Sequence, residues 1–112
     1  MKTLYERLEK NGIDTHLLRL KIVDIILKTL LAIQPELVHN YRKELPADKT
    51  FQMCFEILGF DILIDEDANP WLLEINQAPS FHTHSDLDFQ VKKRVLLDTF
   101  RILGLSEDNR RL

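Results

Sequence analysis

The sequence contains little of the residue types that mark several common protein classes. Its 112 residues include one cysteine, Cys54, so no internal disulfide can form, and this thiol with four histidines gives no zinc-binding spacing. Three glycines and four prolines, all isolated, exclude a low-complexity linker. Charges interrupt the longest apolar segment, 17–33, which therefore falls short of the roughly 20 apolar residues of a membrane span. We expect a reducing, intracellular setting and no membrane partner.

A basic surplus is also missing. Lys and Arg number 15 against 18 Asp and Glu, which gives a formal charge of −3. Proteins that bind nucleic acid usually carry excess positive charge to neutralise phosphates, so we expect no nucleic-acid partner. What is present is a hydrophobic content of 45% and a charged content of 29%, as in an ordinary globular domain of this length.

The N-terminal third predicts a long helix. Residues 1–13 are expected to be a leader or a frayed helix, after which Asp14 or Thr15 can cap the main helix. Pro35 disfavours helical geometry at the residue before it, so the helix is expected to stop at about Gln34.

The polar side chains of this helix form a narrow stripe made by Lys21, Asp24 and Lys28. Most of the remaining circumference is apolar, which predicts burial on more than one side. Apolar surface left uncovered on this helix could drive self-association of the chain.

A hairpin of two strands is expected next. Residues 39–50 are polar and predict a loop, and 51–65 are rich in β-branched and aromatic residues, which favours a strand that begins near Met53. Residues 66–69 are turn-forming and 70–76 predict a second strand. Strict alternation puts Trp71 on the face opposite Glu74 as a core anchor, and Cys54 is expected to be a buried filler.

The C-terminal third predicts a second amphipathic helix. Residues 77–85 are expected to form a loop, Ser85 can cap the helix, and Gly104 can end it. Residues 106–112 are expected to be a tail. The order helix, strand, strand, helix places the chain in the α+β class.

Acidic residues fall at matching positions of the predicted hairpin. If Asp65 faces Pro70, antiparallel pairing places Asp61 opposite Glu74 and Gly59 opposite Asn76. Period-two alternation then brings Asp61, Glu74 and Asn76 to one face. Directly opposed carboxylates repel each other unless a cation neutralises them.

Two carboxylates and an amide oxygen are hard donors that suit Mg²⁺ or Ca²⁺ better than Zn²⁺. Gly59 leaves space for a ligand to approach opposite Asn76. The alternative is that the acids form only the solvent face of an amphipathic hairpin, and a register slip of one residue would send Asp61 to the other face.

Two motifs carry a family resemblance: Gly59-Phe60-Asp61 in the first strand and Pro70-Trp71-Leu72-Leu73-Glu74-Ile75-Asn76 in the second. With Ala78-Pro79-Ser80-Phe81 after them, they resemble the tubulin–tyrosine ligase-like family, and more narrowly its polyglutamylase branch. The resemblance covers residues 22–105. It implies that 14–105 is the C-terminal portion of an ATP-grasp catalytic domain.

The resemblance also implies an activity. Members of the family use ATP and Mg²⁺ to join an amino acid to a tubulin carboxyl group through an acyl-phosphate. By motif position, the ligands for Mg²⁺ and its bound ATP are Asp61, Glu74 and Asn76. Gln77 directly follows Asn76 and is expected either to face the incoming amino acid or to be a polar loop residue that bonds to its own backbone. The implied partners are tubulin or microtubule C-terminal tails and free glutamate, in the cytoplasm and cytoskeleton and also in the cilium or basal body.

The glycine-containing phosphate loop of that family has no counterpart among Gly12, Gly59 and Gly104. The chain is therefore expected to be a truncated catalytic module that is inactive alone. Two other interpretations stay open: a non-catalytic binding remnant on microtubules or cilia, and an ATP-grasp ligase that acts on another protein.

Overall fold

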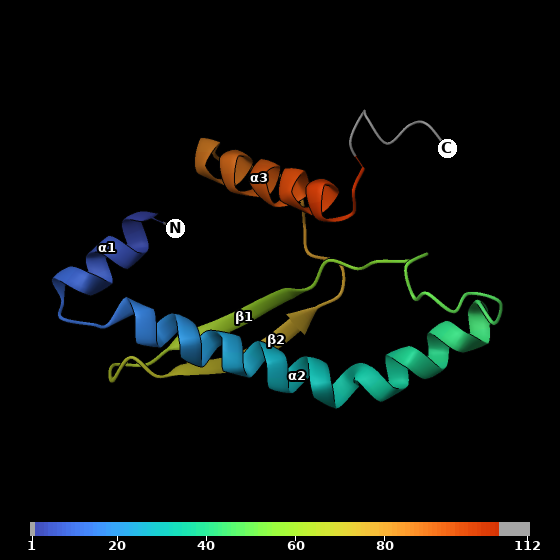
Figure 1. Ribbon diagram of the computed structural model, residues 1–112. Coiled ribbons are helices and arrows are strands. Elements are labelled where there is room, and N and C mark those ends of the chain that lie inside the picture. Colours follow the sequence, from blue (N-terminus) through green and yellow to red (C-terminus); the bar gives the residue numbers. More distant parts are fainter. Residues whose placement is uncertain (1, 106–112) are drawn as a thin grey trace. The chain divides into compact units, whose positions relative to one another are not determined.

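The computed structural model describes residues 2–105, with side chains from Leu4 onward (Figure 1). The predicted tail at 106–112 lies outside the described residues. The elements follow one another in the order α1 (Lys2–Lys10), α2 (Thr15–Glu44), β1 (Gly59–Ile64), β2 (Pro70–Asn76) and α3 (Asp86–Ile102). This mixture of helices with a small antiparallel sheet agrees with the predicted α+β class. The chain divides into two compact units, 1–79 and 80–112.

Helix α2 begins where the sequence predicted. Asp14 is its N-cap, and the Asp14 carboxylate accepts a hydrogen bond of 2.9 Å from the backbone N–H of Leu17. The helix does not stop at Gln34, however, and the predicted end was wrong. It continues through Pro35 to Glu44, so that the first residues of the predicted loop at 39–50 are helical.

Contacts beyond the proline hold the second part of α2. Pro35 removes one backbone donor from the helix, which is costly in a helix interior. The Tyr41 ring lies 5.1 Å from the Phe51 ring, and the Tyr41 hydroxyl donates a hydrogen bond to the Asp48 carboxylate. These contacts tie the last turns of α2 to the segment that follows, and they favour helical geometry there despite the lost hydrogen bond.

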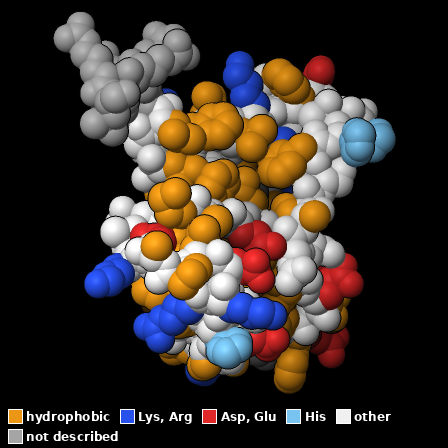
Figure 2. All heavy atoms as spheres, turned by 90° about the vertical axis from the view of Figure 1, so that its right-hand side faces the viewer, with side chains coloured by type: hydrophobic (Ala, Val, Ile, Leu, Met, Phe, Trp, Pro, Cys, Tyr) orange, Lys and Arg blue, Asp and Glu red, His pale blue; other side chains and the backbone are white. Residues whose placement is uncertain are grey.

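The apolar circumference of α2 is largely exposed in this chain. Leu18, with 1% exposure, is the one fully buried apolar side chain of the described residues, whereas Leu27 is 54% and Leu31 69% exposed. The expected burial on more than one side is therefore not found here. Helix α2 runs along the hairpin of β1 and β2 (Figure 1). Figure 2 shows hydrophobic side chains gathered on the surface.

Strands β1 and β2 form a two-stranded antiparallel sheet. Strand β2 has the predicted bounds, but β1 begins at Gly59 rather than near Met53, and 51–58 contains no regular structure. Gly59 pairs with Asn76, where β2 ends, so residues 53–58 have no β2 residue to pair with. Phe51, before them, has a φ of 57°, which is not an extended conformation.

The second unit contains α3. The Ser85 side chain caps the helix by accepting a hydrogen bond of 3.1 Å from the backbone N–H of Asp88, as predicted. Leu103 is the C-cap and Gly104 follows with a φ of 67°, the left-handed conformation typical of residues that end helices. Across residues 2–105, no helix has both the length and the apolar character needed to cross a bilayer.

Candidate metal centre

The hairpin brings the three predicted ligands to one face. Asp61 pairs with Glu74 and Gly59 pairs with Asn76, which is the register that the sequence predicted for these residues. Asp61 and Glu74 are exposed and Asn76 is half-buried. The Asn76 side-chain amide donates a hydrogen bond of 3.3 Å to the Glu74 carboxylate, so these two side chains are neighbours.

The two opposed carboxylates lack a cationic partner in the described part of the chain: none of its ion pairs includes Asp61 or Glu74. Side chains directly opposite each other in an antiparallel sheet have Cβ atoms about 4.5–5.5 Å apart, and like charges there are destabilising. A divalent cation would remove this repulsion.

The donor set fits Mg²⁺, which binds through one or two protein carboxylates and keeps other positions for water and phosphate oxygens. Residues 2–105 contain no cluster of three or more His, Cys, Asp or Glu side chains suited to a metal ion. The candidate centre therefore consists of two carboxylates, from Asp61 and Glu74, and the amide oxygen of Asn76.

Gly59 keeps the backbone close to Asn76. A Cβ atom at position 59 would lie 3.3 Å from the Pro79 Cβ and 3.6 Å from the Asn76 Cβ. The first distance is tighter than most side-chain contacts, so Pro79 would have to shift by a few tenths of an ångström to admit a Cβ, whereas the distance to Asn76 is an ordinary contact. The prediction that Gly59 leaves space for a ligand opposite Asn76 was therefore wrong, because Pro79 occupies that space.

A β-bulge interrupts the hairpin beside the candidate centre. Asp61 pairs with Glu74, but the next residue, Ile62, pairs with Leu72, so Leu73 is an extra residue on β2. At the turn Pro70 pairs with Ile64, and the predicted pairing of Pro70 with Asp65 was wrong.

The bulge moves Trp71 to the other face of the sheet. Trp71 pairs with Leu63, which by alternation shares a face with Asp61. Trp71 is 59% exposed, so its predicted role as a core anchor opposite Glu74 was wrong for this chain. Cys54 is exposed as well and is not the buried filler that was expected.

Asp65 organises the turn of the hairpin. One of its carboxylate oxygens accepts hydrogen bonds from the backbone N–H groups of Asp67 (3.1 Å) and Asn69 (2.7 Å), and the other accepts from the Trp71 indole (2.8 Å). The indole bond first, and then the Asn69 N–H, lower the pKa of Asp65 below its ordinary value. Ala68 has a φ of 60°, which the turn imposes.

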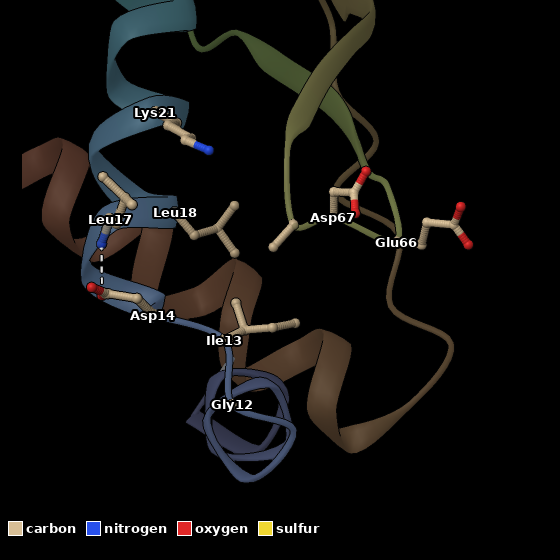
Figure 3. Close-up of a pocket in the computed structure, with 9 residues that line it drawn as sticks. Gly12, Ile13, Asp14, Leu17, Leu18, Lys21, Glu66 and Asp67 are labelled. Atoms are coloured by element: carbon tan, nitrogen blue, oxygen red, sulfur yellow. Dashed lines mark hydrogen bonds between the residues drawn. The ribbon is translucent and has the colours of Figure 1, made fainter.

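The turn also contacts the start of α2. Lys21 donates a hydrogen bond of 2.8 Å to the Asn69 side chain. Close by, a pocket of about 290 Å³ lies between the α2 start and the turn (Figure 3). Leu18 and Ile13 point toward it, whereas the Glu66 carboxylate points outward. The hairpin turn is thus held both by its own side chains and by α2.

The family model described as "Tubulin-tyrosine ligase family" matches residues 1–111. The chain belongs to this family. It is 42% identical over 111 residues to the tubulin polyglutamylase ttll6 of Danio rerio, covering 99% of this chain and 14% of that protein. It is 39% identical over 113 residues to the human tubulin polyglutamylase TTLL7, covering 99% of this chain and 13% of that protein.

A third relative gives the same result. The probable beta-tubulin polyglutamylase of Tetrahymena thermophila is 38% identical over 104 residues, which cover 93% of this chain and 9% of that protein. The chain thus spans 14% or less of the length of these three relatives. The match confirms the family resemblance, and the ligand roles of Asp61, Glu74 and Asn76 stay predictions.

Two polar networks of this member of the tubulin-tyrosine ligase family were not predicted from its sequence. The first is the turn that the Asp65 carboxylate organises. Asp65 and Asn69, which flank the turn residues, could have indicated it, because Asp and Asn side chains often bond to the backbone of a turn. The second joins Asp48 to Thr50 and Tyr41. The hydrogen bond from Thr50 first, and then that from Tyr41, lower the pKa of Asp48 to about 2. Gln77, the predicted substrate contact, is exposed directly after the candidate ligands.

Proposed function

We propose that the chain is part of an ATP- and Mg²⁺-dependent ligase of the tubulin polyglutamylase kind, with an ATP-grasp catalytic domain. The observation that carries this proposal is the pairing of Asp61 with Glu74 on the face that also bears Asn76. Relatives named as tubulin polyglutamylases support the substrate, and membership of the tubulin-tyrosine ligase family supports the ligase class.

In the proposed reaction, the γ-phosphoryl group of ATP passes to the γ-carboxylate of a tubulin-tail glutamate, giving an acyl-phosphate and ADP. The α-amine of free glutamate then attacks the acyl carbon, loses a proton and displaces phosphate, which leaves an isopeptide bond. Both reacting partners of the first step are anions. Bringing them together therefore requires positive charge at the site.

Asp61, Glu74 and Asn76 would hold Mg²⁺ through their oxygen atoms. When bound, the ion supplies charge neutralisation at the β- and γ-phosphates. The three side chains act by position and charge, and none of them is a nucleophile. Gln77 is placed by the chain next to Asn76, and we propose that its amide contacts the incoming glutamate.

We expect no ligation by this chain alone. The phosphates of ATP need backbone donors from a glycine-containing loop, and the three glycines of the sequence are isolated from one another. Gly59 lies in β1 opposite Asn76, with Pro79 packed against it. The tubulin substrate further implies a cytoskeletal location, which includes cilia among its candidates.

A chimera tests the proposed activity directly. The matching segment of the Danio rerio polyglutamylase is replaced by this chain, and ATP-dependent incorporation of labelled glutamate into microtubules is measured. We expect the chimera to be active, Glu74→Gln within it to lose activity by about 100-fold or more, and the exposed turn variant Glu66→Gln to retain it. A folded chimera that works equally well with Glu74→Gln would refute the proposal.

The isolated chain provides a second test without activity. Mn²⁺, used as a paramagnetic probe for Mg²⁺, should broaden the NMR signals of residues 61, 74 and 76 first. The Asp61→Asn variant should lose this selective broadening. Broadening spread evenly over the exposed acidic residues would contradict the assigned site.

A further inference from the structure

The hairpin combines two registers that no regular pairing can hold together. Near the turn, Ile64 pairs with Pro70 and Leu63 with Trp71, whereas at the candidate metal centre Asp61 pairs with Glu74. Continued without interruption, the turn register would set Asp61 opposite Leu73. Glu74 would then move to the face of Phe60, away from Asp61.

The register of the metal centre has the opposite consequence at the turn. Continued to the end of β1, it would pair Ile64 with Trp71 and move the indole to the face opposite Asp61. Asp65 directly follows β1, and its 2.8 Å hydrogen bond from the indole forms while Trp71 lies on the Asp61 face, so we expect the bond to be lost when the indole moves to the other face. The Asp65–Trp71 bond is therefore compatible with the bulge and incompatible with the regular hairpin that keeps Asp61 opposite Glu74.

We propose that the Asp65–Trp71 hydrogen bond selects the bulge at Leu73, and that this bulge aims the Glu74 side chain into the candidate metal centre. Asp65 and Trp71 are thus positioning residues that act through Glu74. The consequence for metal binding rests on the proposed function, whereas the selection of the bulge does not.

Three features of the hairpin support this assignment. Glu74 is the residue that directly follows the extra residue Leu73, and bulges increase the local twist and redirect the neighbouring side chain. The Glu74 carboxylate is within 3.3 Å of the Asn76 amide, so its direction within the candidate set is defined. Leu73 is 64% exposed and is not held by burial, which leaves the turn contacts to fix the bulge.

The experiment uses the full chain, isotope-labelled, and measures register and metal binding in the same NMR sample. Cross-strand nuclear Overhauser contacts of Leu63 report the register near the turn, because they involve Trp71 with the bulge and Leu72 without it. Mn²⁺ titration reports the affinity of the candidate centre. The variants are Asp65→Ala, which removes all three accepted hydrogen bonds, and Trp71→Phe, which keeps a ring and removes only the indole donor.

We expect both variants to shift the Leu63 contacts from residue 71 to Leu72. Glu74 then stays opposite Asp61 but is no longer redirected by the bulge, so Mn²⁺ binding should weaken by about tenfold or more, the usual effect of losing a residue that orients a metal ligand. Asp65→Asn, which keeps an oxygen for the Asp67 and Asn69 donors but faces the indole with a second donor, should resemble Trp71→Phe. The matched control Glu66→Gln removes a charge from the same turn and should change neither measurement.

Deletion of Leu73 separates aim from register. The deleted chain can keep Asp61 opposite Glu74 and Trp71 opposite Leu63 in one regular hairpin, so it lacks only the bulge. We expect its Mn²⁺ affinity to fall about as far as that of Trp71→Phe, and undiminished affinity would overturn the role given to the bulge.

The remaining outcomes are also decisive. If Leu63 still contacts residue 71 in Trp71→Phe, the hydrogen bond does not select the bulge and the inference is wrong, whatever the fold of Asp65→Ala. If the unmodified chain shows the bulge but no Mn²⁺ site, the proposed function fails, while the register contacts still decide whether Asp65 and Trp71 select the bulge.

Discussion

Neutralising one of the opposed carboxylates should change the stability of the hairpin in opposite directions with and without Mg²⁺. The Glu74→Gln variant keeps the size of the side chain and removes its charge. Asp61 then faces an amide instead of a second carboxylate. Directly opposed side chains contribute about 0.2–1 kcal/mol to strand pairing, so the metal-free variant should be more stable than the unmodified hairpin by an amount in this range.

Bound Mg²⁺ should reverse the order. At a free Mg²⁺ concentration ten times the dissociation constant, the unmodified chain gains about 1.4 kcal/mol by mass action. The variant loses one charged ligand and should gain little at the same concentration. Exposed charges are also screened by salt over a Debye length of about 8 Å at physiological ionic strength. The samples without Mg²⁺ therefore need NaCl at matched ionic strength.

Amide hydrogen exchange in β1 and β2 measures the effect locally, because each protected amide reports the free energy of opening its own segment. Glu56→Gln is the matched control, since Glu56 is an exposed acid outside both strands. It should leave exchange in the hairpin unchanged. If Glu74→Gln is less protected than the unmodified chain without Mg²⁺, or gains as much protection on adding Mg²⁺, the repulsion argument is wrong.

Three further predictions follow from local contacts. The pKa of Asp48 is lowered from 3.8 to about 2 in the folded chain. The ionised carboxylate therefore stabilises the fold fully above the ordinary pKa, and this contribution is lost as the pH falls from about 4 to about 2. Acid unfolding followed by circular dichroism should be less steep in Asp48→Asn. Gly59→Ala would bring a Cβ within 3.3 Å of Pro79 and should weaken Mn²⁺ binding about tenfold in calorimetry. Ser85→Ala removes the cap of α3 and should raise amide exchange in its first turn by the equivalent of about 1 kcal/mol.

The sequence allowed the candidate centre to be predicted because the relevant rule is local and strict. Side chains alternate along a strand, so Glu74 and Asn76 must share a face, and Asp61, the one acidic residue of β1, then leaves few registers that bring the oxygen donors together. The caps Asp14 and Ser85 were predictable for the same reason, since a short polar side chain at a helix start satisfies the first free N–H groups.

The extent of α2 was not predictable from the same local rules. Proline disfavours a helix interior, and the prediction stopped the helix before Pro35. The helix continues because Tyr41, six residues further on, contacts Phe51 and Asp48 in the segment that follows. A tertiary contact of this kind depends on the path of the chain after the helix, so it cannot be predicted from the residues near Pro35.

The predicted start of β1 was wrong for a related reason. Apolar and aromatic residues are frequent from Phe51 onward, which favours a strand. Phe51 instead adopts a positive φ and packs against Tyr41, so it serves the end of α2 rather than the sheet. The composition of a segment shows that such a residue is apolar, but it does not show which residue it packs against.

The bulge limits how far along β2 the sequence correctly assigns side chains to the two faces of the sheet. Residues 72 and 73 are both leucine, so the hydrophobic pattern of the sequence cannot show which of them is the extra residue. One extra residue reverses the face of every residue on its far side. Glu74 and Asn76 lie between the bulge and the strand end and were assigned correctly, whereas Trp71 lies beyond the bulge and was assigned to the wrong face. The hydrogen bond that reveals the correct face joins Trp71 to Asp65, and both of these residues belong to the turn rather than to the candidate centre whose geometry they affect.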